Sequence, residues 1–171
     1  MIIFGYPGIG KTTFCEKYPF CIDLESSKYP NKDEYVEEIL ALHRKRQIVF
    51  ASTHAEVIDK VTARVKYKEE ILILFPHLDL KKYWIQKLRR RYEGDDSLKN
   101  LRALLRAEDY FDKDVRHLWY DCKGIKRPIA TMNYHLENII LCYIPDKYRD
   151  RFKTDDGKIY VPEKFKKGDI E

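Results

Sequence analysis

One short run constrains this chain more than any other: Gly5-Tyr6-Pro7-Gly8-Ile9-Gly10-Lys11-Thr12, which fits the pattern G-x-x-x-x-G-K-[ST]. The apolar residues 1–4 before it predict a buried strand, and residues 12–18 after it predict a short helix. With average residue frequencies, this pattern arises by chance in about 1% or fewer of chains of this length. A glycine-rich loop between a strand and a helix predicts a binding site for phosphate groups.

The loop residues have distinct expected parts in holding a polyphosphate. Lys11 is expected to reach the β- and γ-phosphates and to act in catalysis, because its ammonium can follow charge onto the bridging oxygen. Thr12 is expected to bind Mg²⁺, and Thr13 to contact the α-phosphate. The loop therefore predicts ATP and Mg²⁺ as ligands. The expected nucleotide-binding residues are Gly5, Gly8, Ile9, Gly10, Lys11, Thr12 and Thr13.

Apolar runs that alternate with helical patterns predict an α/β fold. Continuous apolar strands with helices between them indicate a parallel sheet that is covered on both faces. The expected strands are 1–4, 20–24, 47–53 and 71–75, and the expected helices are 12–18, about 33–46, 55–64, 80–92 and about 98–107. Residues 139–144 fit either a fifth strand or a helical turn.

We therefore expect a three-layer sandwich around a parallel sheet of about five strands, in one domain over residues 1–171. A helical lid is expected at about 79–107, and residues 145–171 are expected to be loop-like because they are rich in charge.

Composition narrows the class of protein. Hydrophobic residues make up 44% of the chain and charged residues 36%, which predicts a soluble globular protein that is neither disordered nor membranous. Without a signal sequence, we expect a cytoplasmic location. The cysteines lack metal or disulfide spacing and are expected to be free thiols; they are Cys15, Cys21, Cys122 and Cys142. A net charge of +5 suits a phosphate-rich ligand.

A carboxylate is expected to face the transferring phosphate from the second strand. Asp23 ends that strand, which we expect to lie beside the strand that carries the loop. There it could accept a proton from an attacking hydroxyl or bind Mg²⁺, and a turn cap is the alternative. Glu25 and Ser26 follow closely and are further candidates for acceptor binding.

Several other side chains are weaker candidates on the acceptor side. His54, at the tip of the third strand, could bind an acceptor phosphate or base, or could cap the next helix. Arg64 and Lys28 are candidates for contact with an anion. Trp84 and Trp119 are expected to pack in the protein rather than to stack on bases.

These segments together resemble the nucleotide kinase-like (adenylate kinase-like) P-loop kinases, above all the small kinases of bacteriophages. The resemblance covers about residues 1–92 and rests on GYPGIGKTT, CIDLESSKY, a third strand ending in Ser-Thr-His, and ILILFP before an arginine-rich helix. It implies an ATP-dependent phosphotransferase with a mobile lid whose arginines close on the transferring phosphate. By position these would be among Arg89, Arg90 and Arg91, which could instead only complement the helix dipole.

Two features depart from that family. The third strand ends in Ala51-Ser52-Thr53-His54 without the usual acidic residue, so Mg²⁺ would be held by Thr12, phosphate oxygens, water and Asp23. The segment between Asp23 and Gln47 has no arginine near its start to bind a nucleoside monophosphate.

Three functions are compatible with these features. The first is a nucleoside or deoxynucleoside monophosphate kinase. The second is a kinase that phosphorylates a hydroxyl of a polynucleotide or of a modified base such as 5-hydroxymethyluracil in DNA, which the basic surface would suit. The third is a non-catalytic module that binds a nucleotide and regulates a partner, which the missing acid would suit.

Overall fold

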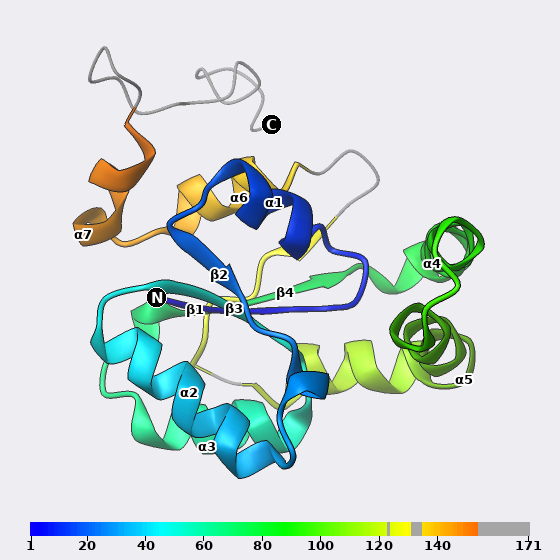
Figure 1. The fold of residues 1–171 in the computed structure, drawn as a ribbon, viewed down its shortest axis with the longest axis horizontal. Coiled ribbons are helices and arrows are strands. Elements are labelled where there is room, and N and C mark those ends of the chain that lie inside the picture. Colours follow the sequence, from blue (N-terminus) through cyan, green and yellow to red (C-terminus); the bar gives the residue numbers. More distant parts are fainter. Residues whose placement is uncertain (123, 131–134, 154–171) are drawn as a thin grey trace.

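The computed structural model describes residues 1–122, 124–130 and 135–153. Within them lies one sheet of five parallel strands in the order β2-β3-β1-β4-β5 (Figure 1). The strands are β1 (Ile2–Gly5), β2 (Cys21–Asp23), β3 (Ile48–Ala51), β4 (Ile71–Pro76) and β5 (Ile129–Ala130). The predicted α/β fold with a parallel sheet of about five strands is confirmed.

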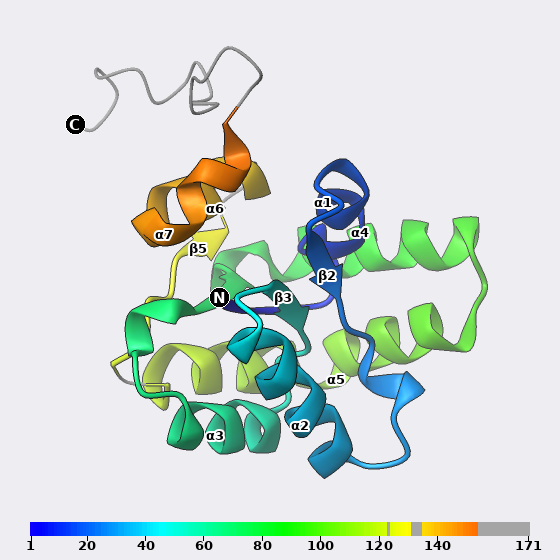
Figure 2. The same cartoon turned by 60° about the vertical axis from the view of Figure 1, so that its left-hand side comes forward.

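Helices cover both faces of the sheet and complete the predicted three layers. Figures 1 and 2 show α1 and α6 on one face, and α2, α3 and α5 on the other. The α-helices are α1 (Lys11–Lys17), α2 (Lys32–Arg44), α3 (Ala55–Arg64), α4 (Lys81–Gly94), α5 (Leu98–Tyr120), α6 (Leu136–Tyr143) and α7 (Asp146–Arg149). Short 3₁₀ helices cover Ser26–Lys28, Lys68–Glu70, Leu78–Leu80 and Asp150–Phe152. No helix in the described part of the chain has the length and apolar character needed to cross a membrane.

The prediction that the Asp23 strand lies beside the loop-bearing strand is wrong. β1 pairs with β3 and β4, so that Ile2 lies opposite Val49 on one side and Ile71 on the other. β2 pairs only with β3 and forms an edge of the sheet. Every residue of β1, β3 and β4 is buried, whereas β2 is short and partly exposed. The strands that are apolar throughout therefore occupy the centre, and the less apolar strand is placed outside them.

The fifth strand is Ile129–Ala130, and residues 139–144 are not a strand. They belong mostly to α6, in which Leu136, Ile140 and the following Ile144 are buried at intervals of four residues. This spacing places them on one side of a helix. A strand of two residues is too short to produce a recognisable apolar run.

Two segments are more helical than the sequence analysis predicts. The helix expected to end near residue 107 continues to Tyr120, because Phe111, Val115 and Leu118 extend its buried stripe at helical spacing. Residues 145–153, expected to be loop-like, include α7 and a 3₁₀ turn that bury Tyr148 and Phe152. The remainder of the expected loop, residues 154–171, lies outside the described residues.

A buried carboxylate fixes α7 to the body of the protein. Glu70 is only 6% exposed, and its Oε2 lies 2.8 Å from His43 Nε2 and 3.3 Å from the hydroxyl of Tyr148. Lys147 makes an ion pair with the other oxygen of Glu70. Burial alone would raise the pKa of Glu70, but these partners outweigh it and hold the pKa below its ordinary value.

Candidate functional site

The glycine-rich loop has a backbone that only glycines adopt easily. Gly8 and Gly10 have φ angles of +82° and +104°, in the left-handed region that a side chain disfavours. A Cβ atom at Gly5 would lie 2.9 Å from side-chain atoms of both Ile9 and Lys11. Ile9 itself is buried, and its N–H donates to the carbonyl of Tyr6 at 3.1 Å. The loop is therefore closed and compact.

The side chain of Lys11 joins the two ends of the loop. Its Nζ donates to the carbonyl oxygen of Gly5 at 2.7 Å. Burial lowers the pKa of Lys11 to about 8; the Asp23 carboxylate opposes this, whereas Arg91 and Lys99 add to it. The ammonium thus lies among charged groups from β2, α4 and α5. The negative charge of a bound polyphosphate would favour its charged form.

A hydroxyl and a carboxylate meet beside this lysine. Thr12 Oγ1, in α1, donates to Asp23 Oδ2 at 2.7 Å, although β3 separates the Asp23 strand, β2, from β1, the strand that precedes the loop. The two predicted metal ligands are therefore brought together. Their oxygens fit Mg²⁺, which prefers oxygen ligands and usually completes its shell with phosphate and water. Thr13 lies exposed in the first turn of α1. Among the described residues, no three His, Cys, Asp or Glu side chains gather as a metal site.

Helix α4 forms a wall of the loop. Trp84 is fully buried, and its Nε1 donates to the carbonyl of Pro7 at 2.8 Å. A Cβ atom at Gly8 would lie 3.1 Å from Leu88 and 3.3 Å from Trp84 Nε1. The region predicted as a lid therefore begins with a helix that packs directly on the loop. Figure 2 shows α4 and α5 as a hairpin whose turn projects away from the sheet.

The three candidate arginines lie in different surroundings. Arg89 pairs with Glu108 of α5 at 2.6 Å. Arg91 follows Leu88 by three residues and Trp84 by seven, so it shares the helix face that meets the loop. Its charge also acts on Lys11. Arg90 lies exposed between them. Among the three, Arg91 is the arginine whose charge acts on Lys11 of the glycine-rich loop.

An ion pair joins the end of β2 to the start of α5. Glu25 pairs with Lys99, and this hydrogen bond is the main reason that the pKa of Glu25 is lowered. Lys28 and Arg91 add to the positive surroundings of Glu25. Ser26 lies in the 3₁₀ turn that follows. Glu25 therefore lies beside a cation supplied by Lys99, and the acceptor-side roles of Glu25 and Ser26 stay predictions.

His54 lies where the sequence places it, at the start of α3, but its side chain makes no capping hydrogen bond. Burial lowers its pKa, and the nearby charges of Lys32 and Arg106 lower it further. The imidazole is thus uncharged near neutral pH. Nearby on the same strand end, the Ser52 N–H donates a hydrogen bond to the hydroxyl of Tyr35 at 2.9 Å. The Ser52 hydroxyl is buried without a partner in the described part of the chain.

Arg64 is not brought to this site. α3 carries it to its far end, just before the segment that leads into β4 at Ile71, and there it pairs with Glu37 through both oxygens. Sequence reasoning missed Arg106, Asp114, Lys99 and Tyr6, which come from α5 and from the loop itself. Only knowledge of the path of α5 could have identified the first three.

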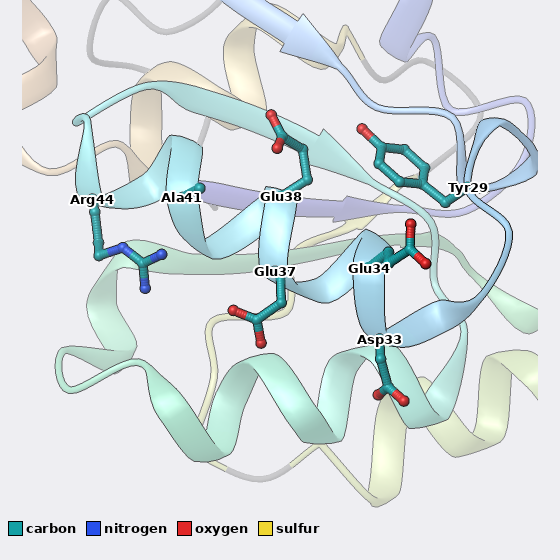
Figure 3. Close-up of a pocket in the computed structure, with 7 residues that line it drawn as sticks. All are labelled: Tyr29, Asp33, Glu34, Glu37, Glu38, Ala41 and Arg44. Carbon is teal, nitrogen blue, oxygen red and sulfur yellow. The ribbon is translucent and has the colours of Figure 1, made fainter.

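A separate hollow of about 500 Å³ lies along α2 (Figure 3). Figure 3 shows that Asp33 and Glu37 point to one side of α2, whereas Glu34 and Glu38 point to the other. The lining is Tyr29, Asp33, Glu34, Glu37, Glu38, Ala41 and Arg44. Because four carboxylates line it, the hollow does not suit a phosphate ligand.

Comparisons with protein-family models, with curated proteins and with solved structures find no match to this chain. The resemblance to nucleotide kinases therefore stays a prediction based on the segments quoted above.

Proposed function

We propose that this chain is an ATP-dependent phosphotransferase, and that its acceptor is a nucleoside or deoxynucleoside monophosphate. The observation that carries the proposal is the 2.7 Å contact of Thr12 with Asp23, next to Lys11 in a loop with two left-handed glycines. Such a loop offers backbone donors and one ammonium to the donor phosphates. The hydroxyl and the carboxylate would hold Mg²⁺ next to them.

Each group then has a part in transfer. An oxygen of the acceptor forms a bond to the γ-phosphorus while the bond from that phosphorus to the bridging oxygen breaks, and ADP leaves. Lys11 would release the carbonyl of Gly5 and follow the charge that develops on the bridging oxygen. Arg91 would stabilise the equatorial oxygens. When bound, Mg²⁺ neutralises charge on the phosphate oxygens.

The placement of Asp23 favours a phosphate acceptor over a hydroxyl. A carboxylate that accepts a hydrogen bond from Thr12 would serve as a metal ligand next to Thr12 rather than as a general base. An attacking phosphate oxygen is already ionised and needs no base. Phosphorylation of a hydroxyl on a polynucleotide or on 5-hydroxymethyluracil in DNA is the alternative.

The third function, a regulatory module without catalysis, was suggested by the missing acid at the end of β3. Asp23 weakens that reading, because it supplies a carboxylate to the site from another strand.

Transfer of label from γ-³²P-ATP tests the proposal. The acceptors are the nucleoside and deoxynucleoside monophosphates, polynucleotide 5′ ends and hydroxymethylated DNA. We expect labelled diphosphates, lost in Lys11→Ala and kept in Lys82→Ala, which alters an exposed lysine of α4. Label only on DNA would support the alternative. Absence of label from every acceptor, or undiminished transfer by folded Lys11→Ala, would contradict a kinase.

A further inference from the structure

A pair of side chains on α5 lies at the same edge of the sheet as the phosphate site. Arg106 Nε and Nη2 donate to the two oxygens of Asp114 at 2.7 and 2.8 Å. Asp114 is 17% exposed and Arg106 54% exposed. The guanidinium has five N–H donors, so two bonds to Asp114 leave three that can contact a ligand.

Packing places this pair beside the loop and the end of β3. The rings of Tyr6 and Phe111 lie 5.8 Å apart at 79°, which fixes α5 against the loop, and Asp114 is one turn after Phe111. Phe4 of β1 pairs with Ala51 of β3. Tyr6 follows Phe4 by two residues, and His54 follows Ala51 by three. Tyr6 and His54 therefore lie at the same carboxyl edge of the sheet, and the charges of Arg106 and Asp114 on α5 act on both.

The chemical character changes along α5. Lys99, near Lys11, is cationic and lies at the start of the helix. Arg106 follows seven residues later, which is about 10 Å along the helix axis. There the guanidinium is balanced by Asp114, and the neighbouring His54 and Tyr6 are uncharged, because burial lowers the pKa of the imidazole and raises that of the phenol. The surroundings of Lys99 therefore suit a phosphate, and the surroundings of Arg106 suit a neutral group with hydrogen-bonding atoms.

We infer that Arg106 and Asp114 recognise the base of the acceptor nucleotide, while its phosphate lies toward Lys99 and Lys11. This inference rests on the proposed function. A nucleobase edge presents a hydrogen-bond donor next to an acceptor, and a guanidinium beside a carboxylate offers the complementary pair. Asp114 also holds the guanidinium in place, as an orienting partner does in other polar sites. Arg106 supplies an arginine that the short segment after Asp23 lacks.

The test compares acceptors with and without a base. Binding of deoxynucleoside monophosphates and of ribose 5-phosphate is measured by calorimetry with a non-hydrolysable ATP analogue present. Loss of one bidentate base contact typically costs about tenfold or more in affinity. We therefore expect Arg106→Ala to weaken binding of its preferred monophosphate about tenfold and to leave ribose 5-phosphate unchanged. Asp114→Asn should change the order of preference among the four bases.

Arg116→Ala is the matched control, since it removes another exposed arginine of α5. Equal weakening of ribose 5-phosphate in Arg106→Ala would mean that Arg106 binds phosphate and would overturn the inference. Unchanged base preference in both variants would overturn it as well, as would failure of the wild-type protein to bind any monophosphate. Base-dependent binding without transfer of label would support the subsite while contradicting the proposed function.

Discussion

The hydrogen bond from Trp84 to Pro7 allows a sharp test of whether α4 shapes the phosphate loop. Replacing Trp84 by Phe keeps an aromatic ring but removes the Nε1 donor that lies 2.8 Å from the carbonyl. The lost bond contributes about 0.5–1.5 kcal/mol. The smaller ring leaves part of a fully buried site unfilled, and together the two losses amount to about 1–3 kcal/mol. For a chain of this size that lowers Tm by roughly 2–12 °C.

Part of the lost free energy should destabilise the loop itself, because Pro7 precedes Gly8, whose backbone lies against Trp84 and Leu88. A loop that has lost this support must be ordered again when ATP binds. If ordering the loop costs about 1 kcal/mol more in the variant, the Kd for ATP rises about fivefold.

Thermal unfolding and calorimetric titration with ATP measure the two effects. Trp119→Phe is the matched control, because Trp119 is 42% exposed and makes an edge contact with Phe75 at 6.0 Å. Its effect on stability should stay within about 0.5 kcal/mol, as at other exposed sites. If the two variants have the same Tm and the same Kd for ATP, α4 does not support the loop in the way argued.

Four further outcomes follow from the same geometry. Above pH about 8 the free protein loses the charge of Lys11, so ATP binding should weaken there and should be accompanied by uptake of a proton. Calorimetry in buffers of different ionisation enthalpy should show this proton uptake. Lys11→Arg should abolish the uptake, because arginine stays charged. Arg91→Ala should lower kcat at least tenfold, whereas Arg90→Ala should stay within about twofold in the same transfer assay. Asp23→Asn should raise the Mg²⁺ concentration needed for half-maximal transfer about tenfold, and an unchanged requirement would remove Asp23 from the metal site. Glu70→Gln should lower the free energy of unfolding by about 1–3 kcal/mol. Because the pKa of Glu70 lies below 4.5 in the fold, the full difference in stability between the two proteins should be present above pH 4.5 and should shrink in more acidic solution. Denaturant unfolding at several pH values would measure this difference.

Local patterns predicted the parts of the molecule that depend on local physics. The loop needs glycines at fixed places because of its φ angles, so its sequence was recognisable in isolation. The bounds of α3, Ala55–Arg64, agree with the prediction because Val57, Ile58 and Val61 mark one buried face. Chemical type alone was a poorer guide. Arg64 is a cation near other candidates in sequence, yet ten helical residues span about 15 Å and carry it away from the site.

Contacts between distant segments could not be read from the sequence. His54 and Arg106 are separated by 52 residues, and the charge of Arg106 acts on His54 only because α5 returns beneath the sheet after α4 (Figure 1). The spatial order of strands was equally hidden. Asp23 was correctly expected near Thr12, but for the wrong reason, since its strand is not the neighbour of β1.

That strand order bears on the missing acid at the end of β3. β3 lies between β1 and β2, so its end is the natural place for a carboxylate that faces the phosphates. In this chain Asp23 reaches Thr12 from the outer strand instead. A second carboxylate on β3 would place another negative charge beside the donor phosphates and beside Asp23. With Ser52 and His54 there, the end of β3 carries no carboxylate, and under the proposed function this leaves it open to the acceptor. If this is correct, Ser52→Asp should weaken ATP binding even though it restores the usual acid, and tighter binding would refute it.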